Sequence, residues 1–260
     1  MLSKSVLDLK RGLSLYHVWL YQAYHEVSAK YKRTFLGSLW ISGAMVATSL
    51  ALAIVMGGIM QVDLAKMLPY TMAGIICFAL MGYVLTDAPE AFMQAANIIK
   101  NHAYPYTYYT FEGISRTFVV FIHNIVVFYI TVLILRQFVV PHWQIVPALV
   151  LVSGTMFFWG SMASMAAARF RDLRFLLPFM SQIIFFLTPV FWHAESVSGW
   201  RSYIVHANPF YGLLEIVRAP LLGNAAPFIA WQLSLVTLGV GIALWTLFFS
   251  LNRGKIAFWI

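Results

Sequence analysis

Six long stretches without a charged side chain dominate this sequence. They are residues 34–62, 67–86, 117–135, 137–168, 175–194 and 219–252. A helix that crosses the roughly 30 Å hydrocarbon core of a bilayer needs about 20 apolar residues. Each stretch is long enough for one such helix and too short for two helices and a turn. Runs such as 183–187 do not alternate between apolar and polar residues, which argues against a transmembrane β-barrel. The pattern therefore predicts an all-α polytopic membrane protein with six transmembrane helices.

The composition supports a membrane protein and excludes several other classes. Hydrophobic residues make up 61% of the chain and charged residues only 10%, whereas soluble domains carry about 25% charged residues. This excludes an ordinary soluble enzyme and a disordered protein. The single Cys77 excludes a disulfide within one chain. A single transmembrane domain, residues 34–260, is expected to follow a cytoplasmic leader, residues 1–33.

The basic residues predict the orientation of the chain. If the N-terminus is cytoplasmic, 13 of the 17 Lys and Arg residues fall in cytoplasmic segments. An excess of Lys and Arg on the cytoplasmic side is the usual signal for orientation. We therefore expect a multi-pass protein of the bacterial inner membrane with both termini in the cytoplasm. This orientation signal explains the net charge of +8 without a nucleic-acid partner. The polar leader before the first apolar stretch argues against a cleavable signal peptide.

The leader and the connection after the second span both predict amphipathic helices. In the leader, Tyr16 and Leu20 belong to an apolar stripe at helical spacing, typical of an interfacial helix on the inner leaflet. A helix packed on a partner is the alternative. The second helix starts at Asp87-x-x-Glu90, continues over residues 91–102 and exposes an apolar face, followed by two basic residues near its end. The apolar face comprises Phe92, Ala95, Ile98 and Ile99, and the two basic residues are Lys100 and His102. The surface suits either a partner protein or lipid.

The segment from His193 to Asn224 predicts two extracytoplasmic half-helices between the fifth and sixth spans. It is too apolar for a free loop, and residues 207–209 (Ala-Asn-Pro) interrupt it. Such backbone is tolerated at membrane depth only against protein or a wet cavity. Within the second half-helix, residues 210–222, Glu215 and Arg218 are three apart and can pair on one face. Glu112 and Arg116, four apart at the inner end of the third span, are expected to pair in the same way.

The sequence lacks the usual motifs for its own energy source or for catalysis. It contains neither a G-x-x-x-x-G-K-[ST] phosphate loop nor an H-E-x-x-H zinc motif, and its seven histidines are scattered. The central turns of five spans carry no ionisable residue, whereas ion-coupled carriers normally keep such groups near the midplane. We therefore expect no catalytic residue, no metal and no cofactor bound by this chain.

Aromatic residues are dense before the third span, where Tyr106, Tyr108 and Tyr109 lie within a few residues of one another. Aromatic rings combine an apolar face with a polar edge, which suits sugar rings that pass without tight binding. The alternative is an aromatic belt that anchors helices at the membrane surface.

Four short motifs occur in order along the chain. Residues 30–40 read K-Y-K-R-T-F-L-G-S-L-W, residues 169–173 read R-F-R-D-L, residues 188–191 read T-P-V-F and residues 208–210 read N-P-F. With the predicted layout, they resemble the ABC-2 type transporter permeases that export lipid-linked polysaccharides such as O-antigen, capsule and teichoic acid. The resemblance covers essentially the whole chain. It implies a homodimer, with two nucleotide-binding ATPase subunits that hold ATP and Mg²⁺.

The resemblance also implies roles for individual residues. The ATPase subunits would dock against Tyr16 and Leu20 of the leader and against the 91–102 helix. Lys30, Lys32 and Arg33 would meet the pyrophosphate of an undecaprenyl-linked glycan, unless they act only as an orientation signal. Two alternatives remain open: an ABC-2 permease for a drug or small lipid, and an integral-membrane enzyme that modifies lipids. The second is disfavoured because the sequence shows no paired carboxylates or His–Asp constellation at a membrane face.

Overall fold

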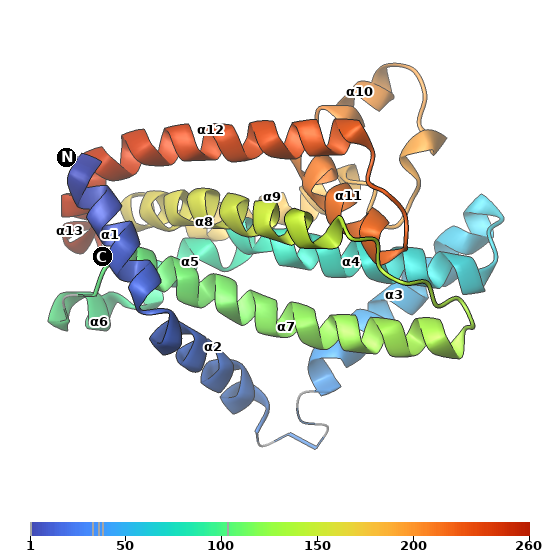
Figure 1. The fold of residues 1–260 in the computed structure, drawn as a ribbon, viewed down its shortest axis with the longest axis horizontal. Coiled ribbons are helices and arrows are strands. Elements are labelled where there is room, and N and C mark those ends of the chain that lie inside the picture. Colours follow the sequence, from blue (N-terminus) through green and yellow to red (C-terminus); the bar gives the residue numbers. More distant parts are fainter. Residues whose placement is uncertain (1, 33, 36, 38, 103) are drawn as a thin grey trace.

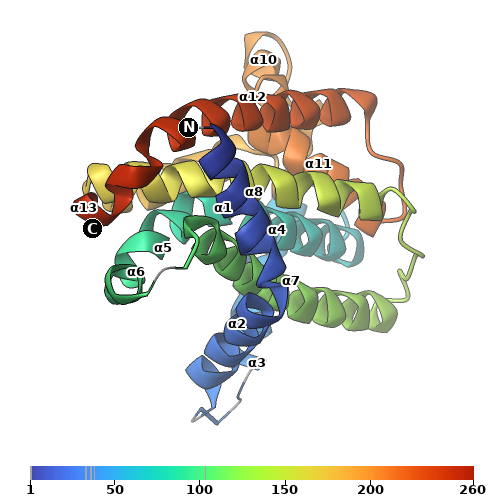
Figure 2. The same ribbon diagram turned by 60° about the vertical axis from the view of Figure 1, so that its left-hand side comes forward.

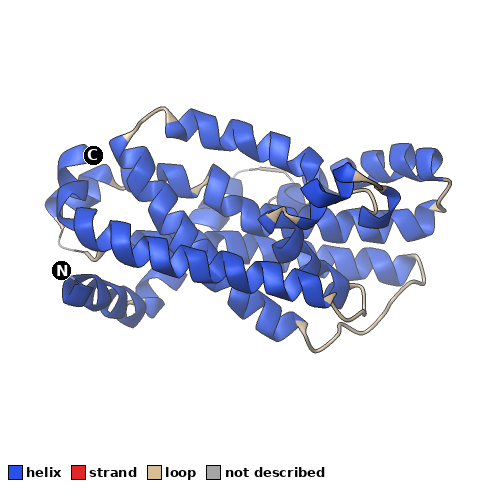
Figure 3. Cartoon of the chain, turned by 90° about the horizontal axis from the view of Figure 1, so that it is seen from above, coloured by secondary structure: helices blue, strands red, loops and turns tan. Residues whose placement is uncertain are grey.

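The computed structural model describes residues 2–32, 34–35, 37, 39–102 and 104–260, and its elements in this part of the chain are all helical (Figure 3). Five helices are long and apolar enough to cross a membrane. They are α3 (Leu39–Met60), α4 (Leu64–Thr86), α7 (Tyr106–Ile134), α8 (Ile145–Arg169) and α12 (Phe228–Asn252). This confirms the predicted fold class, an all-α polytopic membrane protein.

The predicted fifth span is a shorter helix, α9 (Leu173–Leu187). Its 15 residues correspond to about 22 Å, less than the hydrocarbon core. The helix ends because Thr188, which precedes Pro189, is extended with φ −96° and ψ 137°. A residue before proline is disfavoured in the helical region. The described part of the chain thus has five helices of spanning length and not the expected six.

Shorter helices occupy both ends of the bundle. They are α1 (Leu2–Ser14), α2 (Tyr16–Tyr31), α5 (Ala88–Gln94), α6 (Ala96–Asn101), α10 (Trp200–His206), α11 (Pro209–Leu221) and α13 (Ile256–Trp259), with 3₁₀ turns η1 (Ala194–Ser196) and η2 (Arg253–Lys255). Both chain termini lie at one end, with α1, α5, α6 and α13, and we call this the terminal end (Figure 1). Helices α10 and α11 lie at the opposite end, where the sequence predicts two half-helices.

Helix α4 forms the centre of the bundle and packs against α3, α7, α8, α9 and α11. Tyr83 fits between α7 and α8 because glycines face its ring. A Cβ atom added at Gly113 or Gly160 would come within 2.8 Å of Tyr83 atoms. The Tyr83 hydroxyl donates a hydrogen bond to the Thr110 carbonyl oxygen at 3.3 Å. By contrast, α3 leaves most of its apolar surface exposed, as expected for a helix that faces lipid.

Arg218 attaches α11 to the bundle through Pro189 and Tyr70. Arg218 is buried, pairs with Glu215 and donates to the Pro189 carbonyl oxygen. Its guanidinium lies 4.3 Å from the centroid of the Tyr70 ring. At the other end of α11, Asn208 accepts a hydrogen bond from the Phe210 N–H at 3.0 Å and caps the helix. The Asn208–Pro209 break thus starts α11, and Glu215 and Arg218 stabilise its packing.

Candidate functional site

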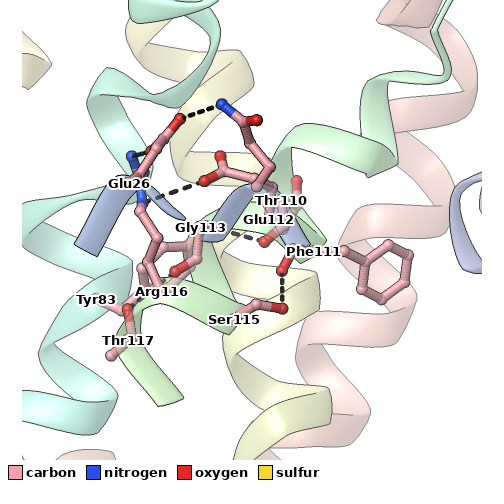
Figure 4. A network of polar contacts seen from close by, with 10 residues as sticks. Glu26, Tyr83, Thr110, Phe111, Glu112, Gly113, Ser115, Arg116 and Thr117 are labelled. Carbon is pink, nitrogen blue, oxygen red and sulfur yellow. Dashed lines mark hydrogen bonds and ion pairs between the residues drawn. The ribbon is translucent and has the colours of Figure 1, made fainter. Parts of the chain in front are cut away.

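The terminal end contains a charge network between α2 and α7. Arg116 Nη1 lies 2.7 Å from Glu26 Oε2, and Arg116 Nε lies 3.3 Å from Glu112 Oε1 (Figure 4). Gln22 donates a hydrogen bond to Glu26 Oε1 at 2.9 Å. One guanidinium therefore faces two carboxyl groups and can balance the charge of only one of them. The i, i+4 spacing shows how Glu112 can meet Arg116, but no local pattern shows the contact with Glu26, 90 residues away.

A second carboxylate, Asp8, joins three elements of the terminal end. It accepts hydrogen bonds from the Thr107 N–H at 3.0 Å and from the Thr107 hydroxyl at 2.9 Å. It also forms an ion pair with Arg253, whose Nη2 lies 2.6 Å from Asp8 Oδ2. The Asp8 side chain has no exposed surface. It therefore caps the N-terminus of α7 and ties α1 to the C-terminal end of α12.

Sequence reasoning missed Asp8 because the partners of a capping residue are normally sought within the same helix. One signal was available: α7 begins after Pro105, which has no side chain that can cap the helix. The first N–H groups of a helix need acceptors. A helix start without a local cap thus indicates an acceptor elsewhere, and α1 supplies it.

A cavity of about 490 Å³ lies between the end of α2, the corner of α4 and α5, and α7. Most of its lining side chains are charged or carry an amide or hydroxyl group. The lining residues are Glu26, Val27, Lys30, Tyr31, Ala79, Thr86, Asp87, Glu90, Gln94, Arg116, Thr117 and Val120. A second cavity of about 310 Å³ lies on the other side of the Glu26–Arg116 pair, between α2 and α6. Helix α2, which diverges from α7 in Figures 1 and 2, lines both cavities.

Residues 22–222 match the family model described as ABC-2 type transporter. This match covers well over half of the chain. The chain belongs to the ABC-2 type transporter family. A comparison with curated proteins found no match. Membership makes the chain a membrane permease of an ABC exporter, a transport subunit that works with an ATPase partner.

The structure divides the expected 91–102 helix of the permease into α5 and α6, which meet at Ala95. Phe92 is buried within the chain and Ile99 is half-buried, whereas Ala95 is buried but lines the 310 Å³ cavity. Helix α5 is held against α8 because the Ser164 hydroxyl donates to the Ala88 carbonyl oxygen at 2.6 Å. Glu90 also pairs with Arg174 at 2.6 Å. Of the expected docking face, Phe92 thus packs inside the chain, and the docking of a partner on this region stays a prediction.

The exposed part of this region is α6 and the residue that follows it. Ile98 has 47% of its surface exposed, and Lys100 and His102 are exposed as well. In the leader, Tyr16 and Leu20 are exposed, whereas Trp19 packs on Phe111 with ring centroids 5.6 Å apart. The apolar stripe of α2 thus points away from the bundle, and an external surface remains open on both α2 and α6.

The expected substrate-contacting tyrosines of the permease lie largely in the interior. Tyr108 and Tyr109 are buried and Tyr106 is half-buried. The Phe92 ring lies 5.9 Å from that of Tyr106 and 6.4 Å from that of Tyr109, between centroids. These side chains therefore join α5 to α7, and Tyr108 and Tyr109 also line the 310 Å³ cavity beside α2. Their helical position was hidden in the sequence because α7 begins 11 residues before the predicted span.

The basic residues at the end of α2 are only partly described. Lys30 and Lys32 are exposed, and Lys30 lines the 490 Å³ cavity. Arg33 lies outside the described residues. In the described part of the chain, no three His, Cys, Asp or Glu side chains gather into a group that could hold a metal ion. The features that the structure brings together are thus a polar cavity, a lysine at its edge and the α2–α7 charge network.

Proposed function

We propose that this permease moves a lipid-linked polysaccharide across the bacterial inner membrane, with the terminal end in the cytoplasm. The observation that carries the proposal is the polar 490 Å³ cavity beside the basic end of α2. Its substrate would be an undecaprenyl-pyrophosphate-linked or other lipid-linked glycan. A second copy of the chain and two ATPase subunits, which bind ATP and Mg²⁺, would complete the exporter. The family resemblance of the sequence motifs supports this assembly.

The lining of the cavity suits sugar better than an apolar drug. Sugar hydroxyls both donate and accept hydrogen bonds, and the cavity offers both kinds of partner in Asp87, Gln94 and Lys30. Gln94 has no side-chain hydrogen bond, and Lys30 no ion pair, with any residue that the structure describes. The lysine stands at the edge, where it can attract a phosphate group of the lipid carrier. Pockets for drug-sized ligands are instead lined mainly by apolar side chains.

The ATPase subunit would bind the surface formed by α6 and the leader. Ile98 contributes an exposed apolar contact, and Lys100 and His102 add positive charge. The 310 Å³ cavity between α2 and α6, lined by Val18, Gln22 and Ile98 among others, gives this surface a recess. Tyr16 and Leu20 are exposed on the same helix as Val18. A partner that contacts both helices could transmit movement to the sugar cavity through α2.

Export by the reconstituted permease and ATPase tests the assignment. Gln94→Leu combined with Lys30→Gln removes two lining groups that lack partners within the described chain. Gln94 also lines the 310 Å³ cavity, so co-purification of the ATPase subunit is measured beside export. We expect glycan export to fall about tenfold, which corresponds to about 1.4 kcal/mol, with unchanged protein level. Asn97→Leu, an exposed amide outside the cavity, is the matched control. Full export by the double variant would remove the support that this cavity gives to the proposal.

One observation favours the alternative, export of a drug or small lipid. A cavity of about 190 Å³ between α4, α8, α11 and α12 is lined almost entirely by apolar side chains, including Leu85, Met156 and Phe210. Leu85→Trp would fill it. If the glycan is the substrate, this variant keeps glycan export. If a small apolar molecule is the substrate, its export is lost while Gln94→Leu is silent.

A further inference from the structure

A separate cavity lies at the terminal end between α8, α12 and α13. Its volume is about 430 Å³, and it shares no lining residue with the cavities beside α2. Met, Phe, Trp and Ala side chains form most of its wall, and one arginine and one asparagine stand among them. The lining residues are Met162, Met165, Ala166, Arg169, Phe170, Phe248, Asn252 and Trp259.

Arg169 places a cation at the edge of this cavity. The neighbouring Arg174 and Arg253 each pair with a carboxylate, but Arg169 forms no ion pair with any residue that the structure describes. Its guanidinium lies 5.8 Å from the Phe170 ring centroid and 5.7 Å from that of Trp259. Two aromatic rings therefore flank an exposed charge that no described carboxylate neutralises.

The Trp259 indole also has an unused polar group. Within residues 2–32, 34–35, 37, 39–102 and 104–260, no hydrogen bond is formed by its N–H. Helix α13 lies against the end of α8 (Figures 1 and 2), and the Trp259 ring lines the cavity there. The rim of the cavity thus presents a guanidinium and an indole N–H, both donors. Such donors match the oxygen atoms of a phosphate group.

The apolar part of the cavity extends from this rim into the membrane-spanning region. Met162 precedes Arg169 on α8 by seven residues, which corresponds to about 10 Å along the helix. Phe248 lies one turn before Asn252 on α12. Both helices are of spanning length. The groove therefore has a charged end at the membrane surface and an apolar wall directed toward the hydrocarbon core.

We propose that this groove binds an anionic phospholipid of the leaflet at the terminal end. The phosphate would contact Arg169 and Trp259, and an acyl chain would lie against Met162 and Met165. Basic pockets between transmembrane helices bind lipids with anionic head groups. Arg169 lies in the last turn of α8, where a cation is favourable without any ligand. That effect does not explain the apolar groove or the aromatic rings beside Arg169. The proposal does not depend on which substrate the permease exports.

Lipid retention by the purified full-length chain tests this site. The chain in neutral detergent is incubated with equal amounts of phosphatidylglycerol and phosphatidylcholine, and bound lipid is counted by native mass spectrometry. We expect about a fivefold preference for phosphatidylglycerol, the effect of about one cation near the membrane surface. Arg169→Gln should abolish this preference. Arg171→Gln, an exposed arginine of the same turn outside the cavity, should keep it.

Two further arms separate a lipid from a free anion and from diffuse surface charge. Met162→Trp fills the apolar groove but keeps the charge, so it should lower phosphatidylglycerol retention, and millimolar inorganic phosphate should not displace the lipid. Displacement by phosphate, or an equal loss in Arg171→Gln, would overturn the proposal. So would an unchanged preference in Arg169→Gln. If that variant does not fold, equal retention of both lipids by the unaltered chain, or full retention by Met162→Trp, decides against it.

Discussion

The leader forms two charged contacts with α7 that differ in kind, in addition to the packing of Trp19 on Phe111. At the first, on α1, the Asp8 side chain is completely buried, accepts hydrogen bonds from Thr107 and pairs with Arg253. At the second, on α2, the Glu26 side chain is 38% exposed and shares Arg116 with Glu112. The first contact is fully satisfied and shielded from water. The second is open to solvent and sets two carboxyl groups against one guanidinium.

This difference shows which part of the leader is costly to move. Removing one partner of a buried ion pair typically costs about 3–5 kcal/mol, whereas an exposed pair contributes about 0–1 kcal/mol. The charged contact of α2 therefore opposes a shift of this helix less than the Asp8 contact opposes a shift of α1, although Trp19 also packs α2 on Phe111. Because α2 lines both cavities at the terminal end, such a shift would change their size without separating α1 from α7 and α12.

The largest effect is expected for Asp8→Ala. It leaves the first N–H groups of α7 without their acceptor and Arg253 without its carboxylate. Because Arg253 is itself 31% exposed, we expect a loss at the lower end of the range for buried pairs, about 3 kcal/mol. Thermal unfolding of the detergent-solubilised chain measures it. Asp63→Ala removes an exposed cap that accepts from the Ala65 N–H at 2.7 Å and should cost only about 1 kcal/mol. Equal losses would refute the contrast.

A smaller effect is expected at the open surface beside α2. Ile98→Asp leaves the fold intact because Ile98 is 47% exposed. If the ATPase subunit covers this residue, an unpaired carboxylate becomes buried at the contact, at a cost of about 2 kcal/mol or about 30-fold in affinity. Co-purification of the two subunits measures the change. Asn97→Asp is the control, since it adds the same charge on α6 at an exposed amide, and it should keep normal co-purification. Normal co-purification of Ile98→Asp would contradict the proposed docking surface.

The next smaller effect is expected in the charge network of Glu26, Glu112 and Arg116. Arg116→Ala leaves Glu26 and Glu112 near each other without a cation, and Glu112 is only 12% exposed. We expect a loss of about 1–2 kcal/mol in the free energy of unfolding. Adding Glu26→Gln to this variant removes one of the two charges and should recover part of the loss. The double variant compared with each single variant measures the coupling. If Arg116→Ala is as stable as the unaltered chain, Arg116 does not stabilise the two carboxyl groups and the prediction is wrong.

The sequence predicted the parts of this molecule that depend on local patterns. Uncharged runs predict where the long helices lie, and Asn208–Pro209 predicts the start of α11. The shortening of α9 was missed because apolar length was counted through Pro189, which ends the helix. Phe92 and Ala95 were expected on an open surface because an apolar face looks the same whether its own chain or a partner covers it. Asp8 and Glu26 have partners that lie 90 to 245 residues away, and no local pattern predicts such contacts.

The smallest effect on stability is expected for Glu26→Gln, which tests the weaker attachment of the leader directly. The change removes the excess carboxylate and leaves Arg116 paired with Glu112, so the free energy of unfolding should change by less than 1 kcal/mol. Helix α2 nevertheless loses its charged contact with α7. Hydrogen exchange should therefore accelerate in α2, while α1 keeps the protection that its buried Asp8 contact provides.

Gln22→Ala is the matched control, since it removes the hydrogen bond to Glu26 Oε1 but keeps the ion pair. It should leave exchange in α2 nearly unchanged. High salt gives an independent measurement, because screening weakens exposed charge pairs more than buried ones. Salt should thus accelerate exchange in α2 of the unaltered chain and have little effect on the Glu26→Gln variant. If α1 and α2 instead exchange together under all these conditions, the leader moves as one unit and the two attachments are not independent.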